Sequence, residues 1–341
     1  MSEDRVRLAL TVGDPGGVGP ELAGSLLAKR KLSGAELFVI GAFSALESWL
    51  PPRECGAPRP IPLAEAEKLR EPDSFPVYID TGEETPYRRG RPTSEGGRAA
   101  GRAIEAAAAL AKRGLVEGIV TGPISKEALA LGGYTKVSHT ELLASLFDAP
   151  DCQMMMVSGG LRIVILTRDI PLREVPAAVT AARIEAGVRV TAGALGELFG
   201  VERARIAVAA LNPHAGDGGV LGTEERDTIR PALEALRAEG LLVDGPFPAD
   251  TMFYKWERKR YDAFVALYHD QGMIPFKAGG FEEGVNMTIG LPIVRTSVCH
   301  GTAYDLAGSG TAATGSLESA FRLAVECCRA RRKRRAARGG A

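Results

Sequence analysis

Short runs of Val, Ile and Leu alternate with longer stretches in which apolar residues recur at helical spacing, almost from one end of the chain to the other. The short runs predict strands at residues 7–12, 36–41, 118–122, 162–167, 205–211, 263–269 and 290–298. The longer stretches predict helices at residues 20–32, 95–114, 175–200, 223–240 and 316–333. Strands that are almost entirely apolar and alternate with helices indicate a largely parallel sheet covered on both faces, so the pattern predicts an α/β fold.

Two regions depart from this alternation. Residues 51–96 are rich in Pro, Arg and Glu, and they predict an irregular excursion with weak strands. The basic run RARRKRRAARGG at residues 329–340 follows the last apolar-periodic segment. We interpret this run as a solvated, frayed tail rather than as a surface for RNA or an acidic partner.

The length and composition are typical of a globular protein with more than one core. With 341 residues the chain exceeds the usual size of a single hydrophobic core, so we expect two domains with a cleft. The 42 basic residues balance the 42 acidic ones, which favours neither nucleic acid nor membrane as a partner. No run of about 18 apolar residues occurs and the first residues are charged, so we expect a cytoplasmic protein. The five cysteines form no CxxC pair and predict reduced thiols.

All four histidines lie in loop-like segments beside polar residues or glycine; they are His139, His214, His269 and His300. Histidines that serve only in packing would be expected to scatter over helices and apolar faces. These histidines instead fall at the ends of predicted strands, where α/β enzymes keep their sites. The distribution therefore indicates a functional site.

His214 and His269 follow separate predicted strands and are candidates for a metal site. Two neutral imidazoles, with carboxylates such as Asp250 and Asp270 nearby in sequence, can bind a divalent ion. The spacing alone also fits histidines that are hydrogen-bonded to turn backbone, and both interpretations stay open at this point.

The glycine-rich segment GDPGGVGPE at residues 13–21 lies between a predicted strand and a predicted helix. It lacks the GxGxxG spacing, and no GxxxxGKS or GxxxxGKT motif occurs, so a nicotinamide would not bind in the usual Rossmann manner. The glycines fit either a close approach to phosphate or a tight strand-to-helix connection.

Three cations lie beside Gly or Pro near strand ends, namely Lys126, Lys277 and Arg295. Such charge-assisted donors suit a bound phosphate or carboxylate, although each taken singly is more typical of a surface charge. Cys299 beside His300 suggests a thiolate and its base, but neighbours on a strand point to opposite faces. No G-x-S-x-G elbow occurs, so nucleophilic catalysis is disfavoured.

Nine motifs in a fixed order carry a family resemblance. They are GDPGGVGPE, TGPISKEAL, SHTELLA, LTRDIPLREVP, LNPHAGDGGVLGTEE, GPFPADTMF, YHDQGMIPFK, GVNMTIGLPIVRTSV and HGTAYDLAGSG. In content, order and spacing they resemble the motifs of the 4-hydroxythreonine-4-phosphate dehydrogenase family, from about residue 6 to about residue 325. The resemblance implies two α/β/α domains with a central cleft, of the isocitrate and isopropylmalate dehydrogenase type. It also implies a homodimer whose active site is shared between subunits.

On the strength of this resemblance we expect residues 1–125 and 300–341 to form the first domain. Residues 126–299 would form the second domain and carry most of the metal and substrate residues. The resemblance assigns substrate binding to His139, Thr140, Lys277, Asn286 and Arg295. Candidates for a catalytic role are Asp250, Asp270 and Lys126. No residue is assigned to the nicotinamide cofactor.

The resemblance assigns metal binding to His214 and His269, but the third metal-binding histidine of the family is replaced by Asp169 in the sequence RDIPLR. Aspartate in place of a neutral imidazole makes the site harder and shifts its preference from Zn²⁺ or Co²⁺ toward Mg²⁺ or Mn²⁺. Cys299 stands where the family commonly has aspartate. Both departures fall close to the expected site, so a related enzyme of the family that acts on a related substrate is an alternative.

The implied activity is oxidation of 4-phosphooxy-L-threonine by NAD or NADP with one divalent metal ion, in pyridoxal phosphate synthesis. The product, 2-amino-3-oxo-4-(phosphooxy)butanoate, would decarboxylate to 3-amino-2-oxopropyl phosphate. One alternative is a related dehydrogenase for a phosphorylated four-carbon sugar acid or an aromatic dihydrodiol. Another is an inactive homologue that binds a metabolite, although an idle site has no need for the histidines and the substrate residues present in this chain.

Overall fold

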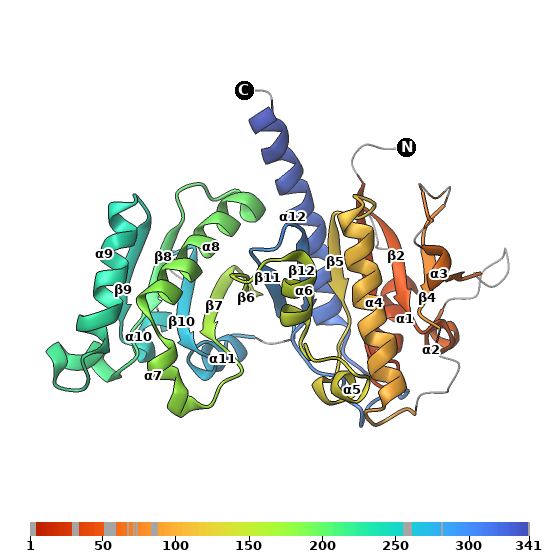
Figure 1. Ribbon diagram of the computed structural model, residues 1–341, viewed down its shortest axis with the longest axis horizontal. Helices are drawn as coiled ribbons and strands as arrows, with labels where there is room; N and C mark the ends of the chain where they lie inside the picture. The colour runs from red at the N-terminus through yellow and green to blue at the C-terminus, as the bar shows by residue number, and fades with distance from the viewer. Residues whose placement is uncertain are drawn as a thin grey trace. The chain divides into compact units, whose positions relative to one another are not determined.

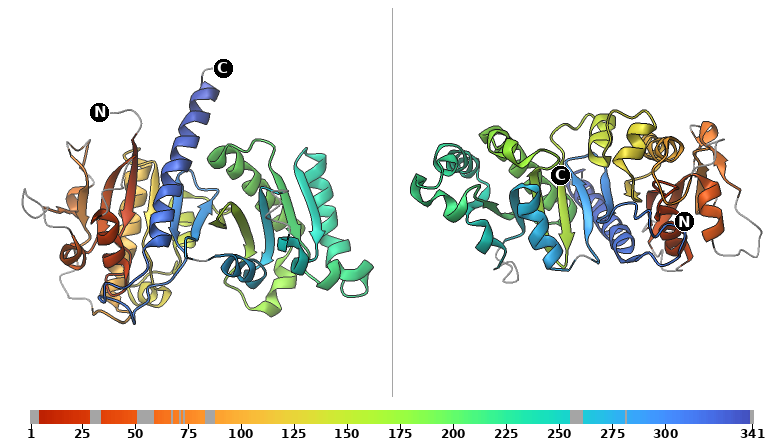
Figure 2. Two further views of the ribbon diagram at one scale, coloured as in Figure 1. Left: turned by 180° about the vertical axis from the view of Figure 1, so that it is seen from behind. Right: turned by 90° about the horizontal axis from the view of Figure 1, so that it is seen from below.

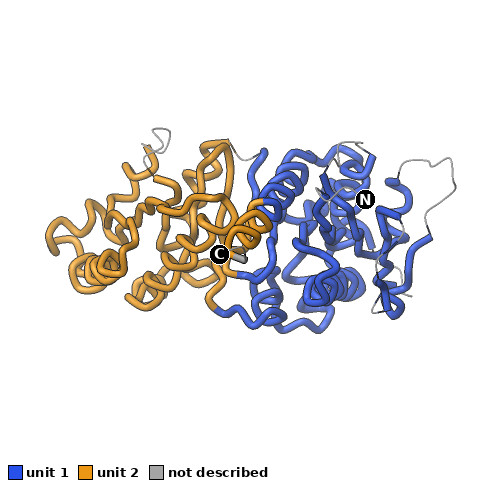
Figure 3. The backbone as a smooth tube through the Cα atoms, turned by 90° about the horizontal axis from the view of Figure 1, so that it is seen from above, with its two compact units in different colours: residues 1–150, 282–285, 291–329 blue, residues 151–281, 286–290, 330–341 orange. Residues whose placement is uncertain are grey.

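The computed structural model describes residues 5–28, 34–50, 59–66, 68–70, 72, 74–82, 88–254, 261–280 and 282–339. The chain divides into two compact units (Figure 3). Unit 1 comprises residues 1–150, 282–285 and 291–329, and unit 2 comprises residues 151–281, 286–290 and 330–341. Each unit is therefore built from segments that are distant in sequence.

Unit 1 is built on a parallel sheet with the strand order β3-β4-β2-β1-β5-β12 (Figure 1). Its strands are β1 Val6–Thr11, β2 Ala35–Gly41, β3 Ile61–Pro62, β4 Val77–Asp80, β5 Gly118–Thr121 and β12 Val294–Val298. The helices that begin in it are α1 Gly19–Ala28, α2 Phe43–Leu46, η1 Glu47–Trp49, α3 Leu63–Ala66, α4 Ser94–Lys112, α5 Lys126–Leu131, α6 His139–Phe147 and α12 Gly315–Gly339. The strands are largely buried because helices such as α4 pack on β1, β2 and β5.

Unit 2 is built on a mixed sheet with the strand order β11-β6-β7-β10-β8-β9. Its strands are β6 Gln153–Ser158, β7 Leu161–Thr167, β8 Arg205–Ala209, β9 Leu242–Phe247, β10 Ala263–Tyr268 and β11 Val285–Ile289. β6 and β7 are antiparallel, whereas β7, β10, β8 and β9 run parallel. The helices are η2 Leu172–Glu174, α7 Val175–Ala178, α8 Ala181–Phe199, η3 Pro213–Gly219, η4 Glu225–Ile229, α9 Arg230–Ala238, α10 Ala249–Met252 and α11 His269–Ala278. α8 packs on β6 and β7, α9 on β9, and α11 on β7 and β10 (Figure 2).

The predicted α/β class is confirmed, and every predicted strand and helix corresponds to an observed element. Among the strands that the pattern missed, β6 and β9 lack the runs of Val, Ile and Leu on which the prediction rests. β6 has the sequence QMMMVS, and β9 has the sequence LVDGPF with Asp, Gly and Pro. Both strands exist because they pair with well-formed neighbours, which a local pattern does not reveal. Part of the expected excursion at residues 51–96 lies outside the described residues, and its described part includes β3, α3 and β4.

Two features of the helices differ from the prediction. The helix expected at residues 175–200 is interrupted at Val179, because the extended backbone of Thr180 starts a new helix and its side chain accepts a hydrogen bond from Arg183 N. The short helices α5, α6 and α11 were not predicted, since six to ten residues give too few apolar repeats to read. α5 and α6 begin at the side-chain caps Ser125 and Ser138.

The compact units place residues 126–150 with unit 1, whereas we expected the second domain to begin at residue 126. The reason is close packing of α5 and α6 on α4. A Cβ added to Gly97 would lie 1.8 Å from Ala128 O, and one added to Gly101 would lie 2.1 Å from the ring of Tyr134. The glycines of α4 therefore let this segment dock against unit 1.

The basic run at the C-terminus is helical through Gly339, which corrects the expectation of a frayed tail. Arg331 is 7% exposed, and its Nε lies 2.8 Å from Glu197 Oε1. Arg334 donates a hydrogen bond of 2.7 Å to Gly196 O. The partner residues, Glu197 and Gly196, both belong to α8 in unit 2. Tertiary contacts therefore hold the C-terminal end of α12.

Cys152, Cys299, Cys327 and Cys328 are reduced thiols, as predicted, and Cys55 lies outside the described residues. None of the described helices has both the length and the apolar character that a bilayer-crossing segment needs.

Candidate active site

The first group of predicted substrate residues lies in unit 1, where His139 and Thr140 open helix α6. Ser138 caps this helix, since its Oγ accepts a hydrogen bond of 3.2 Å from Glu141 N. The cap fixes the two following side chains at a helix start rather than in the loop that we expected for His139. Thr140 is 8% exposed and the Nε2 atom of His139 is buried.

Arg295 gives this region a buried positive charge. It lies on β12, is 1% exposed, and donates a hydrogen bond of 2.7 Å from Nη2 to Thr121 Oγ1. Burial, together with the positive charge of Arg295, holds the pKa of His139 well below 6.5, so its imidazole is neutral at pH 7. Among the described residues, Nε2 of His139 has no hydrogen-bond partner. A neutral imidazole beside a buried guanidinium suits an anionic ligand that also carries a polar group.

The loop after β12 carries Cys299 and His300. Cys299 N donates to Ser316 Oγ over 3.0 Å, and Nδ1 of His300 lies 2.9 Å from Gly301 O. Both residues follow the end of the strand at Val298. Lys126, a candidate for a catalytic role, is the exposed first residue of α5 in the same unit.

The glycine-rich segment after β1 forms a tight connection within unit 1. Gly13 has φ +85°, and a Cβ there would lie 2.2 Å from Pro123 O. Asp14 is buried, and it accepts hydrogen bonds from Gly16 N at 2.8 Å and from Tyr304 Oη at 2.6 Å. Burial raises the pKa of Asp14, although both hydrogen bonds oppose the shift. Protein atoms fill the space beside these glycines, which favours the connection rather than the phosphate loop.

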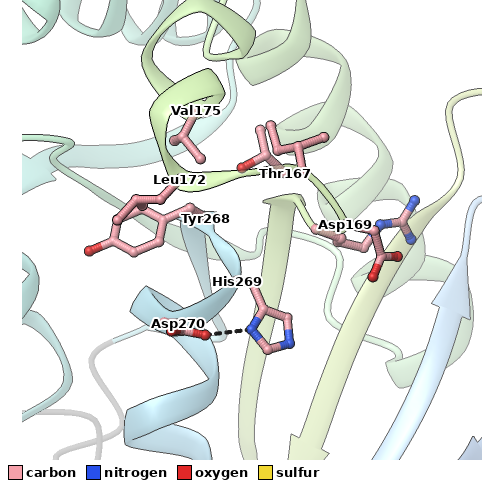
Figure 4. Close-up of a pocket in the computed structure, with 9 residues that line it drawn as sticks. Thr167, Asp169, Leu172, Val175, Tyr268, His269 and Asp270 are labelled. Carbon is pink, nitrogen blue, oxygen red and sulfur yellow. Dashed lines mark hydrogen bonds and ion pairs between the residues drawn. The ribbon is translucent and has the colours of Figure 1, made fainter.

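The second group of predicted residues surrounds a pocket of about 330 Å³ in unit 2. Its lining residues are Thr167, Arg168, Asp169, Ile170, Leu172, Val175, Tyr268, His269 and Asp270 (Figure 4). Asp169 lies on the segment after β7, and His269 and Asp270 open helix α11. Two of the three predicted metal ligands therefore border one pocket.

Asp270 contacts His269 directly, with Oδ1 2.6 Å from Nδ1 (Figure 4). A carboxylate in this position favours a proton on Nδ1 and leaves the lone pair of Nε2 for a ligand. The side chains of His269 and Asp270 are 49% and 71% exposed. This contact gives Asp270 an orienting role toward a metal ligand.

His214 lies on a backbone segment of unusual conformation. Five successive residues, 214–218, have φ between 43° and 79°, and three of them are not glycine. Each non-glycine residue in this region costs roughly 1–2 kcal/mol, so the surrounding structure must hold it. Leu211 N and Asn212 N each donate a 2.8 Å hydrogen bond to Oε1 of the buried Glu225. Glu225 thus anchors the start of the strained segment.

The remaining predicted residues are spread over unit 2. Lys277 is exposed in the last turn of α11, and Asp250 is exposed on α10. Asn286 lies on β11, and its buried Oδ1 has no hydrogen-bond partner among the described residues.

The donor set fits a divalent ion in its chemistry, because two imidazoles and a carboxylate are common ligands and Asp270 orients one imidazole. Within the described part of a single chain, however, no three His, Cys, Asp or Glu side chains are gathered closely enough to hold a metal. A site built from three ligands among these described residues therefore needs a movement of their segments or a ligand from a second chain.

Comparison with known proteins identifies the family. Residues 38–324 match the sequence profile described as "Pyridoxal phosphate biosynthetic protein PdxA". The chain belongs to this family. The 4-hydroxythreonine-4-phosphate dehydrogenase of Trichlorobacter lovleyi is 41% identical over 333 residues, which cover 96% of this chain and 98% of the relative. The enzyme of the same name from Paracoccus denitrificans is 43% identical over 332 residues, which cover 96% and 98%.

Solved structures agree with the PdxA assignment. The 4-hydroxythreonine-4-phosphate dehydrogenase of Klebsiella pneumoniae superposes with a TM-score of 0.82 at 39% identity, covering 95% of this chain and 99% of that chain. A terephthalate 1,2-cis-dihydrodiol dehydrogenase from Burkholderia xenovorans superposes less closely, with a TM-score of 0.65 at 28% identity over 94% and 98% of the two chains.

For this PdxA family member, sequence reasoning missed the buried polar residues Asp14, Glu225 and Gln271 and the half-buried Tyr304 that donates to Asp14. Glu225 lies in a stretch read only as helix, and Gln271 lies beside the more conspicuous His269 and Asp270. Only Gln271 had a sequence signal, which was its position two residues after His269, because burial of a polar side chain is a tertiary property.

Proposed function

We propose that this protein oxidises 4-phosphooxy-L-threonine with NAD or NADP to 2-amino-3-oxo-4-(phosphooxy)butanoate, which then loses CO₂ to give 3-amino-2-oxopropyl phosphate. The observation that carries the proposal is the identity of 41% over nearly the whole chain with relatives of that name. The motifs that hold the predicted site residues lie within the matched region.

In this proposal the unit 1 residues bind the anionic substrate. Arg295 supplies a positive charge that the protein has already removed from water, so it can pair with phosphate or carboxylate without further desolvation of the arginine. Neutral His139 and the hydroxyl of Thr140 offer polar contacts beside that charge. Lys277 and Asn286 supply a second cation and an amide.

We further propose that His214, His269 and Asp169 hold one divalent ion. A bound ion would supply Lewis acidity toward the substrate hydroxyl, and a bound nicotinamide would supply the hydride acceptor. Asp270 holds the His269 ring so that Nε2 is available. Asp250 and Lys126 are then the candidates for moving the hydroxyl proton, since Asp270 is already engaged with His269.

A direct test is turnover of purified protein with 4-phosphooxy-L-threonine, NAD⁺ or NADP⁺ and Mg²⁺, Mn²⁺, Co²⁺ or Zn²⁺, followed by the absorbance of the reduced nicotinamide. The unphosphorylated 4-hydroxy-L-threonine is the matched control, because it lacks only the group that Arg295 or Lys277 would bind. No reduced nicotinamide with any metal, from folded protein, would reject the proposed reaction.

We also propose that the active site is shared in a homodimer, with Asp169 of one subunit completing the metal site of the other. Mixed dimers of His214→Ala and Asp169→Ala subunits test this, because a shared site then has one intact copy per mixed dimer. Reassociated mixtures should recover about a quarter of the wild-type activity for statistical mixing. No recovery would place all three ligands in one chain.

A second candidate is a dehydrogenase for an aromatic dihydrodiol or a phosphorylated four-carbon sugar acid. Asp169 and Cys299 favour it, since both depart from the family motifs close to the expected site. The likeness to a solved dihydrodiol dehydrogenase at 28% identity is in keeping with it. These substrates belong in the same turnover assay, and a preference for one of them by kcat/KM would replace the first proposal. An inactive homologue would turn over none of them.

A further inference from the structure

The side chain of Gln271 bonds to the ends of two strands, β10 and β8, that lead to the candidate metal ligands His269 and His214. It lies in the first turn of α11, two residues after His269, and is 8% exposed. Its Oε1 accepts a hydrogen bond of 2.7 Å from Leu267 N, and its Nε2 donates one of 2.7 Å to Ala210 O. Both ends of the amide are therefore used.

The two backbone partners of Gln271 lie at the ends of neighbouring parallel strands, Leu267 within β10 and Ala210 directly after β8. The register of β10 and β8 pairs Phe264 with Ala207 and Val265 with Val208, and the described pairing stops there. Continuing this register would place Leu267 opposite Ala210. Beyond the last direct backbone pair, the side-chain amide of Gln271 thus bridges the two strand ends: it accepts from the N–H of one and donates to the C=O of the other, as a backbone peptide group would.

Each of these positions leads directly to a candidate ligand. Leu267 is two residues before His269, and Ala210 is four residues before His214. Both are completely or almost completely buried, with exposures of 0% and 1%. The buried amide of Gln271 therefore links the chain segment that leads to His269 with the segment that leads to His214, and Glu225 holds the latter segment further along at Leu211 and Asn212.

A further buried hydrogen bond connects the end of β10 to the end of β7. Thr167 at the end of β7 is 1% exposed, and its Oγ1 donates a hydrogen bond of 2.7 Å to Leu267 O. Asp169 follows two residues later. Buried hydrogen bonds thus join the carboxyl ends of β7, β10 and β8, and each end leads into a segment with one candidate ligand.

We infer that Gln271 is a positioning residue that fixes the spacing of His214 and His269 for a divalent ion. The inference rests on the proposed function, because it takes these histidines as the ligands. Gln271 itself does not touch the metal or the substrate. Its loss would leave Leu267 N–H and Ala210 C=O buried without partners, so the strand ends would rearrange and the imidazoles would move apart or turn.

The test compares Mn²⁺ binding to metal-free wild type and to Gln271→Met by isothermal titration calorimetry. Methionine has a similar length but neither hydrogen bond. We expect the Kd for Mn²⁺ to rise about 10- to 100-fold, as for other residues that orient metal ligands, and kcat to recover in part at saturating Mn²⁺. Gln271→Glu, which keeps the size and the acceptor for Leu267 N–H, is the second variant if the first does not fold, and its Kd should also rise.

The matched control is Thr191→Val in α8 of the same unit. Thr191 is 0% exposed and its Oγ1 donates 2.7 Å to Gly187 O, so its replacement also removes a buried hydrogen bond, but away from the strand ends. It should lower the melting temperature without changing the Kd for Mn²⁺. Equal Kd values for wild type and the folded Gln271 variant would overturn the inference and leave the proposed function standing. Absence of Mn²⁺ binding to wild type would overturn the metal site and the inference together.

Discussion

The candidate substrate residues of unit 1 (His139, Thr140 and Arg295, the substrate side) and the candidate metal ligands of unit 2 (Asp169, His214 and His269, the metal side) differ in which polar residues are buried. In unit 1 the candidate ligand itself is buried: Arg295 is 1% exposed and is fixed by Thr121. In unit 2 the candidate ligand His269 has a side chain that is 49% exposed, and the buried residues Gln271 and Glu225 instead hold the backbone segments that lead to His269 and His214.

This difference has a physical reason. A guanidinium that pairs with an anion gains most where water is excluded, so burial before binding strengthens the contact. A metal ion instead brings its own charge and selects its geometry, so exposed ligands serve if their backbone is held firmly. We therefore expect the metal side to tolerate a change of ligand type, such as Asp169 for histidine, better than the substrate side tolerates a change of charge.

The largest expected effect is that of His214→Ala. Removing a metal ligand should lower kcat by more than about 100-fold, because changes to residues that merely support ligands already cost 10- to 100-fold. The variant should still bind the substrate, since the unit 1 residues are untouched. Wild type treated with a chelator is the control and should show the same loss. Full activity of wild type after exhaustive chelation would contradict a metal-dependent reaction.

The next effect concerns the buried charge on the substrate side. Arg295→Met keeps a similar volume without the charge, and its melting curve is compared with that of wild type to check that the variant is folded. The KM for the phosphorylated substrate should rise about 100-fold, which corresponds to loss of a charge-assisted hydrogen bond. Arg322→Met, at an exposed position of α12, is the matched control and should leave KM unchanged. An unchanged KM in Arg295→Met would remove Arg295 from the substrate site.

A smaller effect tests whether Asp169 sets the metal preference. Asp169→His should shift relative affinity toward Zn²⁺ or Co²⁺ over Mg²⁺ by about tenfold while keeping some turnover, because imidazole is the softer ligand. Asp169→Ala should weaken every metal. Titration of each ion into metal-free wild type and both variants provides the measurement. Identical affinities in all three proteins would show that Asp169 only shapes the turn before Pro171.

The smallest effect concerns His139 and stability at low pH. Because the folded protein lowers the pKa of His139, the unfolded chain takes up a proton first as pH falls below 6.5. The free energy of unfolding should then decrease by up to about 1.4 kcal/mol for each unit that the pH falls in that range, from this residue alone. His139→Gln should remove that part of the slope in denaturant unfolding at pH 7, 6 and 5. The same slope in both proteins would mean that His139 is protonated when folded.

The sequence alone was sufficient for the α/β class, for the main strands and helices, and for the family. These properties depend on local patterns: β1 and β10 are almost wholly apolar, and α4 repeats its buried residues at helical spacing. It also pointed to the neighbourhood of the site, because His214 and His269 follow strands. It could not assign residues 126–150 to unit 1, since that depends on glycines of α4 meeting Ala128 and Tyr134.

Only the tertiary structure decided which polar residues are buried and what they hold. Gln271 and Asp270 are neighbours in sequence, yet one joins β8 to β10 inside the protein and the other orients His269 at the surface. Glu225 belongs to an apparently ordinary helical stretch, and only the fold brings it to Leu211 and Asn212. The reason is that burial and hydrogen bonding between distant segments depend on how the elements pack, which no local periodicity encodes.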